Sequence, residues 1–364
     1  MSTTNEYAPF NLTKSIRQSP PLDFSIPYSE SWLSGKHILI TGGASGFGEG
    51  FARRWAAAGA SIVVGDINEK LGTSTVASIR LETKNENVWF VKCDVCDWDA
   101  QVQMFKEAVR LSPHKGIDVV VANAGIAGTD PMQMPVVRNG EVQKPNLKIL
   151  EVDLIGVMYT SHLAFHYLPN NPGSLDCSVN ANPENASFKR DRLLLLTGSV
   201  ASLGPIANQP QYGTAKHGVL GLFRCLRGSS FVQGVRVNLL CPYFIETPIV
   251  PAEARLLMAG AAYGKVEDVV EAATRLTADS RILGRSVVIG PKVRVKQEDS
   301  GDWKFVGFGP GEGGEEKAIW EAYAEDWEDS EVFTRRMVVL LNIVQKARGW
   351  LGALSDIVKV FAGR

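Results

Sequence analysis

The stretch HILITGGASGFGEG, residues 37–50, decides the fold class of this chain. HILIT is a short apolar run typical of a buried strand, and the glycines after it let the chain turn sharply into a helix. Free N–H groups at the start of such a helix favour an anion, so the turn is a candidate pyrophosphate site formed by Gly42, Ser45, Gly46, Phe47 and Gly48. A plain tight turn without a ligand is the alternative for a glycine cluster taken alone.

Outward from this turn, short apolar runs alternate with helical patterns from about residue 35 to residue 290. Runs rich in Val, Ile and Leu are typical of strands buried on both faces, and their alternation with helices implies right-handed crossovers and a parallel, doubly wound sheet. The seven expected strands are HILIT, SIVVGD, VWFVKCD, IDVVVANAG, LLLLTGS, VRVNLLCP and SVVIG. We therefore predict one seven-stranded, Rossmann-type α/β domain over residues 35–292, although a length of 364 residues alone suggests about two domains.

Turn formers and prolines mark the segments outside the expected strands and helices. Residues 1–34 are polar and carry several prolines, so we expect an extended N-terminal arm. Residues 128–146 and 169–190 are rich in turn formers and are expected to be surface insertions. After residue 292 we expect a C-terminal extension, with a hairpin, a glycine-rich turn and helices from about 315 to 361.

The last part of this extension, residues 331–361, mixes apolar positions with basic ones. A helix of this kind can pack on its own domain or on a second subunit, which is the favoured interpretation. It can also lie on a membrane surface, or cover a site that binds a large apolar ligand. The sequence leaves these three roles open.

The overall composition excludes several classes of protein. With 38 basic and 39 acidic residues the formal net charge is −1, so nothing in the balance favours nucleic acid or an anionic membrane as a partner. The sequence has no run of 18 apolar residues and no apolar leader, so we expect neither a transmembrane helix nor a signal peptide. A cytoplasmic location follows as an expectation.

Cysteine and histidine positions do not predict a metal site. The five cysteines are odd in number and scattered, which is typical of reduced thiols. Cys93 and Cys96 form a CxxC pair without a second pair at zinc-site spacing. His162 and His166 lack the acidic residue of an HExxH pattern, so packing is the expected role of all four side chains.

An acidic residue follows the glycine turn at a meaningful distance. Asp66 lies twenty residues after Gly46 and closes the second expected strand. At that place a carboxylate accepts hydrogen bonds from ribose hydroxyls and repels a 2′-phosphate, and Ser45 offers no basic group to that phosphate. The pattern favours NAD over NADP, with a simple helix cap as the alternative role of Asp66.

Ser199, Tyr212 and Lys216 form a second candidate site. Ser199 ends the strand LLLLTGS, and Tyr212 and Lys216 are four residues apart in YGTAK, so they share one face of a helix. An ammonium beside a phenol in a low-dielectric pocket favours the phenolate, which lets a tyrosine act as general acid or base. Ser199 would hold the substrate oxygen as charge changes there.

These motifs together resemble the short-chain dehydrogenase/reductase family over about residues 35–290. TGGASGFG looks like the TGxxxGxG turn of that family, the strand end at Cys93–Val95 like its adenine contact, ANAG at 122–125 like its NNAG element, and PYFIET at 242–247 like its PGxxxT stretch. The resemblance adds six cofactor contacts to those named above: Asp94, Val95, Asn123, Gly125, Ile245 and Thr247.

The resemblance implies an NAD-dependent oxidoreductase that interconverts a secondary alcohol and a ketone, with Tyr212 and Lys216 also contacting the cofactor. Residues 198–222 are most similar to the NAD-dependent 15-hydroxyprostaglandin dehydrogenase group, in which the position of Gln209 lies beside the reacting alcohol. The chain also resembles fungal secondary-metabolite alcohol dehydrogenases. An apolar segment at 249–262 lies where the family has its substrate loop, which favours a bulky, largely apolar small molecule as substrate.

Oligomeric state is expected from the family alone. The helices predicted near 145–167 and 211–228 commonly form a four-helix interface between subunits, so a homo-oligomer is expected.

Two residues depart from the family pattern. Asp153 stands where the family usually has an asparagine that holds a water on a proton relay, and its charge would stabilise Lys216 and offset part of the effect of that lysine on Tyr212. Tyr243 replaces a glycine near the nicotinamide end and would narrow the substrate pocket. These departures motivate an alternative function: a protein of the same fold that binds NAD without redox turnover, as a scaffold, sensor or non-redox cyclase.

Overall fold

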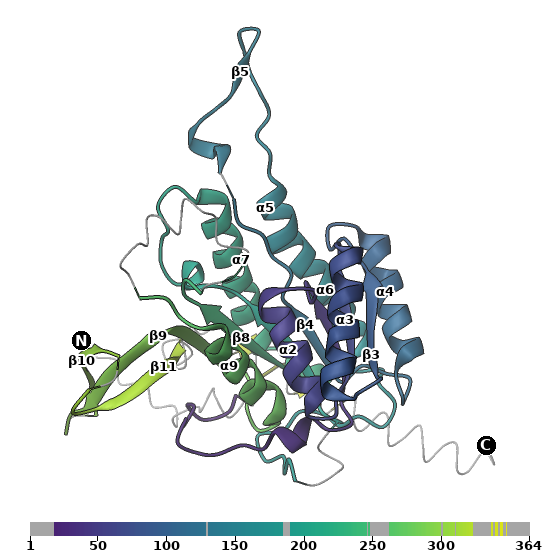
Figure 1. Ribbon diagram of the computed structural model, residues 1–364. Helices are drawn as coiled ribbons and strands as arrows, with labels where there is room; N and C mark the ends of the chain where they lie inside the picture. The colour runs from purple at the N-terminus through teal and green to yellow at the C-terminus, as the bar shows by residue number, and fades with distance from the viewer. Residues whose placement is uncertain are drawn as a thin grey trace.

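The computed structural model describes residues 18–128, 130–184, 190–245, 247, 262–299, 301–309 and 311–322, and seven residues between 336 and 347. A twisted central sheet has helices on both faces (Figure 1). Most of the apolar segment expected at 249–262, and most of the tail at 331–361, lie outside the described residues.

The strands follow the order β3-β2-β1-β4-β7-β8-β9, and within the described residues all seven pair in parallel. This confirms the predicted doubly wound sheet. The bounds of the strands are β1 (His37–Thr41), β2 (Ser61–Asp66), β3 (Val88–Lys92), β4 (Val119–Ala122), β7 (Arg192–Thr197), β8 (Val235–Pro242) and β9 (Ser286–Gln297). β1 pairs with β2 on one side and β4 on the other, and every one of its side chains is buried.

In the part of the chain that the structure describes, six long helices cover the two faces of the sheet (Figure 1). One face packs against α2 (Gly46–Ala57), α3 (Glu69–Thr83) and α9 (Val266–Ala278), and the other against α4 (Trp98–Leu111), α6 (Val157–Tyr167) and α7 (Pro210–Arg227). Phe51, Trp55 and Leu276 fill the first layer, whereas Phe105 and Phe223 fill the second. Two apolar layers on one sheet explain why its strands are continuously apolar rather than alternating.

The helix expected over 145–167 is not a regular α-helix throughout. A short α5 (Lys148–Leu150) leads into a π-helical segment, η3 (Glu151–Gly156), which continues as α6. Segments of π-helix occur often at functional sites because the wider turn re-aims a side chain. Here the segment carries Asp153, which is fully buried.

The first expected insertion, 128–146, projects from the body as an arm (Figure 1). Its tip is a hairpin of β5 (Val137–Arg138) and β6 (Glu141–Val142), and the turn residues Asn139 and Gly140 both have positive φ angles. An Asn-Gly pair with this backbone is typical of the two-residue turns that match the twist of a hairpin.

The N-terminal segment that the structure describes is anchored on the domain rather than detached from it. The Ser19 N–H donates to the Leu283 carbonyl at 3.0 Å. A short helix, η1 (Glu30–Leu33), then buries Trp32 and Leu33 in the layer formed by α2 and α9.

The C-terminal extension begins with the expected hairpin, since β9 runs on past β8 and pairs antiparallel with β10 (Trp303–Phe308). The helix expected from about 315 is wrong over Glu315–Ala322, which form β11 along the other edge of β9. The Glu, Lys and Ala residues of this segment favour a helix locally, but a twelve-residue strand with an open edge offers a ladder of backbone partners. Tertiary pairing outweighs local propensity here.

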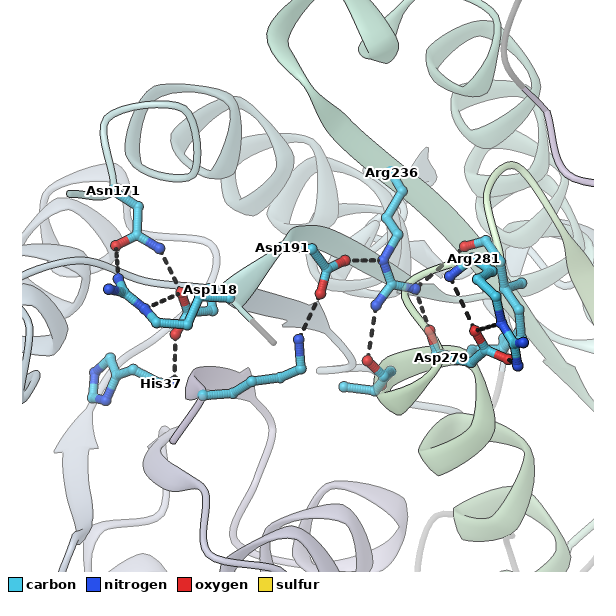
Figure 2. A network of polar contacts seen from close by, with 12 residues as sticks. His37, Asp118, Asn171, Asp191, Arg236, Asp279 and Arg281 are labelled. Carbon is cyan, nitrogen blue, oxygen red and sulfur yellow. Dashed lines mark hydrogen bonds and ion pairs between the residues drawn. The ribbon is translucent and has the colours of Figure 1, made fainter. Parts of the chain in front are cut away.

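A buried polar network joins the amino ends of the central strands, opposite the glycine turn (Figure 2). The Asp191 carboxylate pairs with Lys36 at 2.5 Å and also with Arg236, linking the beginnings of β1, β7 and β8. The Asp118 carboxylate accepts from the His37 N–H at 2.7 Å and from the Asn171 side chain at 2.6 Å. Each buried carboxylate is therefore paired or hydrogen-bonded, as a buried charge requires.

No helix among the described residues is long and apolar enough to cross a bilayer.

Candidate active site

The candidate site lies at the carboxyl ends of the strands, where β1 and β4 are neighbours although their connections run to opposite halves of the sheet. Such a switch point leaves a crevice, which is the usual ligand site of open α/β sheets. The glycine turn follows β1, Asp66 closes β2, and Asn123 follows β4 directly. Ser199 follows β7 by two residues, so residues far apart in the sequence meet along one edge.

The glycines of the turn divide into packing and open positions. Gly42 has φ +64°, and a Cβ there would lie 2.7 Å from the Ala124 Cα. A Cβ at Gly48 would lie 2.4 Å from the Gly42 carbonyl oxygen. Gly46 has φ +57°, but no described atom lies within 4 Å of where its Cβ would be. The first two glycines allow close packing, while Gly46 leaves backbone accessible to a ligand.

Asn123 holds the turn in place. Its side-chain amide donates to the carbonyls of Thr41 and Gly42, both at 3.1 Å, and its own N–H donates to the Thr41 hydroxyl at 3.0 Å. Asn123 therefore links the end of β4 to the end of β1, a supporting role that its position in the ANAG motif did not reveal.

The Asp66 carboxylate belongs to the same cradle. One oxygen accepts from the Ala44 N–H at 3.1 Å and the other from the Asn68 N–H at 2.9 Å. A carboxylate has about four acceptor positions, so these two bonds leave capacity for ribose hydroxyls. The N-cap residue Ser45 makes no side-chain hydrogen bond to the described first turn of α2, which leaves helix N–H groups for an anion. These residues fit a dinucleotide.

The loop expected to contact adenine follows β3. The Asp94 carboxylate accepts from the Cys96 N–H at 2.9 Å, which shapes the loop. Val95 is buried, and a Cβ at Gly156 would lie 2.9 Å from its side chain. The position of Val95 is thus fixed by close packing on η3.

Ser199, Tyr212 and Lys216 are contributed by β7 and α7. The Lys216 ammonium lies 5.5 Å from the centroid of the Tyr212 ring, as the four-residue spacing predicts. The Ser199 hydroxyl oxygen accepts from the Ala201 N–H at 3.1 Å and lies 3.4 Å from the Pro242 carbonyl. These contacts fix the serine side chain at the end of β7, and Lys216 is almost fully buried.

Asp153 forms a buried ion pair with Lys216. Its Oδ2 lies 3.1 Å from the Lys216 Nζ, and its Oδ1 accepts from the Ile126 N–H at 2.8 Å. Burial by itself lowers the pKa of Lys216, but the Asp153 carboxylate, together with weaker contributions from Tyr212 and Cys241, outweighs this effect and raises the pKa above its ordinary value. The geometry provides the charge stabilisation that was expected of a carboxylate at this position, by direct contact.

The remaining expected residues lie around this centre. The Gln209 side-chain amide donates to the Gly128 carbonyl at 3.1 Å. Tyr243 is partly exposed, with its ring edge-on to Phe244 at 5.0 Å between centroids. Ile245 and Thr247 are both buried.

Two further residues of the site were missed by sequence reasoning. Asp130 and Gln211 are both buried and hydrogen-bonded to each other directly beside Tyr212. They are 81 residues apart, so no local spacing signals the contact. No group of three or more His, Cys, Asp or Glu side chains among the described residues is arranged to hold a metal ion.

Comparison with known proteins identifies the family. The model of the family described as enoyl-(acyl carrier protein) reductase matches residues 42–279. This chain belongs to the short-chain dehydrogenase/reductase family. A short-chain dehydrogenase/reductase from Mycobacterium marinum has the same fold, with a TM-score of 0.59 and 23% sequence identity over 71% of this chain and 95% of that one.

Relatives with curated names are dehydrogenases. The 5′-hydroxyaverantin dehydrogenase of Dothistroma septosporum is 33% identical over 71% of this chain and 86% of its own length. An NADP-dependent dehydrogenase of Phoma sp. is 29% identical over 75% and 79%. The bovine 15-hydroxyprostaglandin dehydrogenase (NAD(+)) is 29% identical over 60% and 71%. Like these relatives, this chain is an oxidoreductase that interconverts alcohols and ketones.

Proposed function

We propose that this enzyme uses NAD to interconvert a secondary alcohol and a ketone on a bulky, largely apolar small molecule of secondary metabolism. The observation that carries the proposal is that Ser199 follows β7 at the carboxyl end of the sheet, the end that also carries the open glycine turn, and that Tyr212 and Lys216 lie together on α7. Relatives whose names specify secondary-metabolite and prostaglandin alcohols support the substrate class.

Each residue of the site has a separate task in this proposal. The substrate hydroxyl lies between Ser199 and Tyr212, and the Tyr212 phenolate accepts its proton as the alcohol carbon loses hydride. The Ser199 hydroxyl donates to the same oxygen and fixes it, while the buried Lys216 ammonium supports the phenolate. NAD, when bound, supplies the hydride acceptor at this position.

The preference for NAD over NADP rests on the end of β2. Asp66 presents a carboxylate where the adenosine ribose would bind, and the next residue, Ile67, is exposed and apolar. A 2′-phosphate would meet a negative charge there. The relatives include both NAD- and NADP-dependent enzymes, so the preference is argued from these residues alone.

The direct test is an assay of the purified protein with NAD and a panel of hydrophobic secondary alcohols, followed by NADH absorbance. We expect turnover of bulky apolar alcohols and little of small polar ones. Turnover restricted to small polar alcohols would contradict the substrate class, and no redox turnover with any alcohol or ketone would favour the non-redox alternative.

A homo-oligomer and a cytoplasmic location stay predictions. Ile155 and Met158, on η3 and α6, are exposed apolar residues on the helical region expected to join subunits. Light scattering on the full chain measures the first prediction, and a mass equal to one chain would contradict it.

A further inference from the structure

The helix that carries Tyr212 does not supply its own N-terminal cap. The N-cap residue of α7, Gln209, makes no side-chain hydrogen bond to the helix, and its first turn contains no acidic residue. By contrast, Asp97 caps α4 locally by accepting from the N–H groups of Asp99 and Ala100. Free N–H groups and the positive end of the dipole make an uncapped helix start costly inside a protein.

The missing cap of α7 comes from the root of the projecting arm. Asp130 Oδ2 accepts from the backbone N–H of Gln211 at 2.6 Å, and Asp130 Oδ1 accepts from the Gln211 side chain at 3.1 Å. Both residues are buried, so these bonds form in a low-dielectric environment where a charge-assisted bond is strong. The carboxylate and α7 are therefore coupled across 81 residues of sequence.

The same helix start also binds the other end of the arm. The Gln211 side-chain nitrogen donates to the Asn146 carbonyl at 3.0 Å, so one amide joins both ends of the arm. One residue before α7, the Gln209 side chain donates to the Gly128 carbonyl at 3.1 Å. The segment that follows Gly125 is thus tied to α7 at three places, next to the reacting tyrosine.

We propose that Asp130 and Gln211 are positioning residues for Tyr212, which fix the first turn of α7 against the segment after Gly125 and so set where the phenol meets the substrate oxygen. This inference rests on the proposed role of Tyr212. Proton and hydride transfer require the reacting atoms in a narrow geometry, and a displacement of about 1 Å can cost roughly 10²-fold in rate. The arm root and the tyrosine then move as one unit.

The test compares Asp130→Ala and Gln211→Leu with Asp97→Ala, a matched loss of a helix cap on α4. At saturating NAD we expect kcat to fall roughly 10- to 100-fold in the first two variants, with a larger primary deuterium isotope effect because hydride transfer becomes limiting. Asp97→Ala is expected to lower the unfolding temperature while kcat stays within about twofold of the parent. The Kd for NAD should be unchanged in Asp130→Ala and Gln211→Leu.

Conservative replacement separates positioning from general stability. Asn in Asp130→Asn still accepts from the Gln211 N–H, so we expect it to recover most of the kcat lost in Asp130→Ala. Equal kcat in Asp130→Ala, Gln211→Leu and the parent would overturn the proposal, as would an equal fall in Asp97→Ala.

A double variant distinguishes failure of this inference from failure of the proposed function. If the contact between Asp130 and Gln211 acts by positioning the phenol, Gln211→Leu should lower activity little further in a Tyr212→Phe background. Full activity of Tyr212→Phe alone would contradict the proposed function. An inactive Tyr212→Phe together with a fully active Gln211→Leu would contradict only the positioning role of Asp130 and Gln211.

Discussion

Among single residues, the direct contact between Asp153 and Lys216 is the main departure of this site from the family pattern, which has an asparagine in place of Asp153. The ammonium is buried and lies 3.1 Å from a carboxylate that also accepts from a backbone N–H. A carboxylate keeps the lysine charged, yet it also opposes a second negative charge on the nearby phenol. Lys216 is therefore held in its charged form, but its ammonium stabilises a negative charge on Tyr212 less than it would without the carboxylate beside it.

Removing that charge should shift the pH dependence of oxidation. In Asp153→Asn the pKa of Lys216 falls, because the carboxylate that raises it is gone and burial still lowers it. The limb of the kcat profile at high pH, on which Lys216 loses its charge, should therefore move towards lower pH. Glu151→Gln, which removes an exposed carboxylate of the same π-helical segment, is the control. An unchanged profile for Asp153→Asn would contradict the role of the ion pair.

The Asp66 carboxylate should control cofactor choice. Asp66→Asn retains an acceptor for the Ala44 N–H but removes the charge facing a 2′-phosphate. We expect the ratio of kcat/KM with NADP to that with NAD to rise roughly tenfold or more, since one unfavourable charge contact of about 1.4 kcal/mol is lost. A ratio that stays at the parent value means that another residue sets the preference.

At the scale of elements, the strand–turn–helix at β1 and α2 could be predicted from sequence because its signal is local. Seven apolar runs likewise predicted seven parallel strands, since each is buried on both faces. Two other features could not be predicted. The strand at Glu315–Ala322 depends on the open edge of β9, and the cap of α7 depends on Asp130, a residue remote in sequence. Both are decided by tertiary partners rather than by nearby residues.

Two glycines of the turn should respond differently to substitution, Gly48 through packing and Gly46 through ligand binding. Gly48→Ala places a Cβ against the Gly42 carbonyl, so we expect a loss of stability visible as a lower unfolding temperature without ligand. Gly46→Ala meets no described atom and costs only about 1–2 kcal/mol for its positive φ, but its Cβ would enter the space proposed for the pyrophosphate. For Gly46→Ala we expect a large rise in the Kd for NAD and only a small fall in the unfolding temperature. The opposite order of effects in the two variants would contradict this division of roles.

In the molecule as a whole, the two ends of the sheet carry different sets of polar residues. The carboxyl ends of the strands carry the reaction site, while the amino ends carry the buried network around Asp118 and Asp191 (Figure 2). The network joins the beginnings of strands from both halves of the chain. Its members are scattered single polar residues, and the sequence offered no pattern by which to group them.

This network should make stability depend on pH through His37. Burial lowers the pKa of His37 to about 4, from an ordinary value of 6.5, although its ring bonds the Ala108 carbonyl. Between pH 6.5 and 4 the unfolded chain therefore binds a proton at His37 that the folded chain does not bind. The neutral, buried His37 contributes about 3 kcal/mol to the free energy of unfolding above pH 6.5, and this contribution is lost as the pH falls towards 4.

We expect His37→Gln to flatten the fall in unfolding free energy between pH 6.5 and 4, measured by denaturant titration. His217→Gln, on the exposed side of α7, is the control. The same slope in the parent and in His37→Gln would show that other groups cause the acid sensitivity.

In the proposed reaction Tyr212 exchanges the proton during hydride transfer, so turnover by Tyr212→Phe is the decisive measurement. Both kcat with NAD and a hydrophobic secondary alcohol, and the Kd for NAD, are measured beside Tyr159→Phe, which removes the hydroxyl of a ring packed on Trp98 in α4. We expect kcat to fall roughly 10²- to 10⁴-fold in Tyr212→Phe, with NAD binding retained and Tyr159→Phe unaffected. Full turnover by Tyr212→Phe would contradict this role of Tyr212.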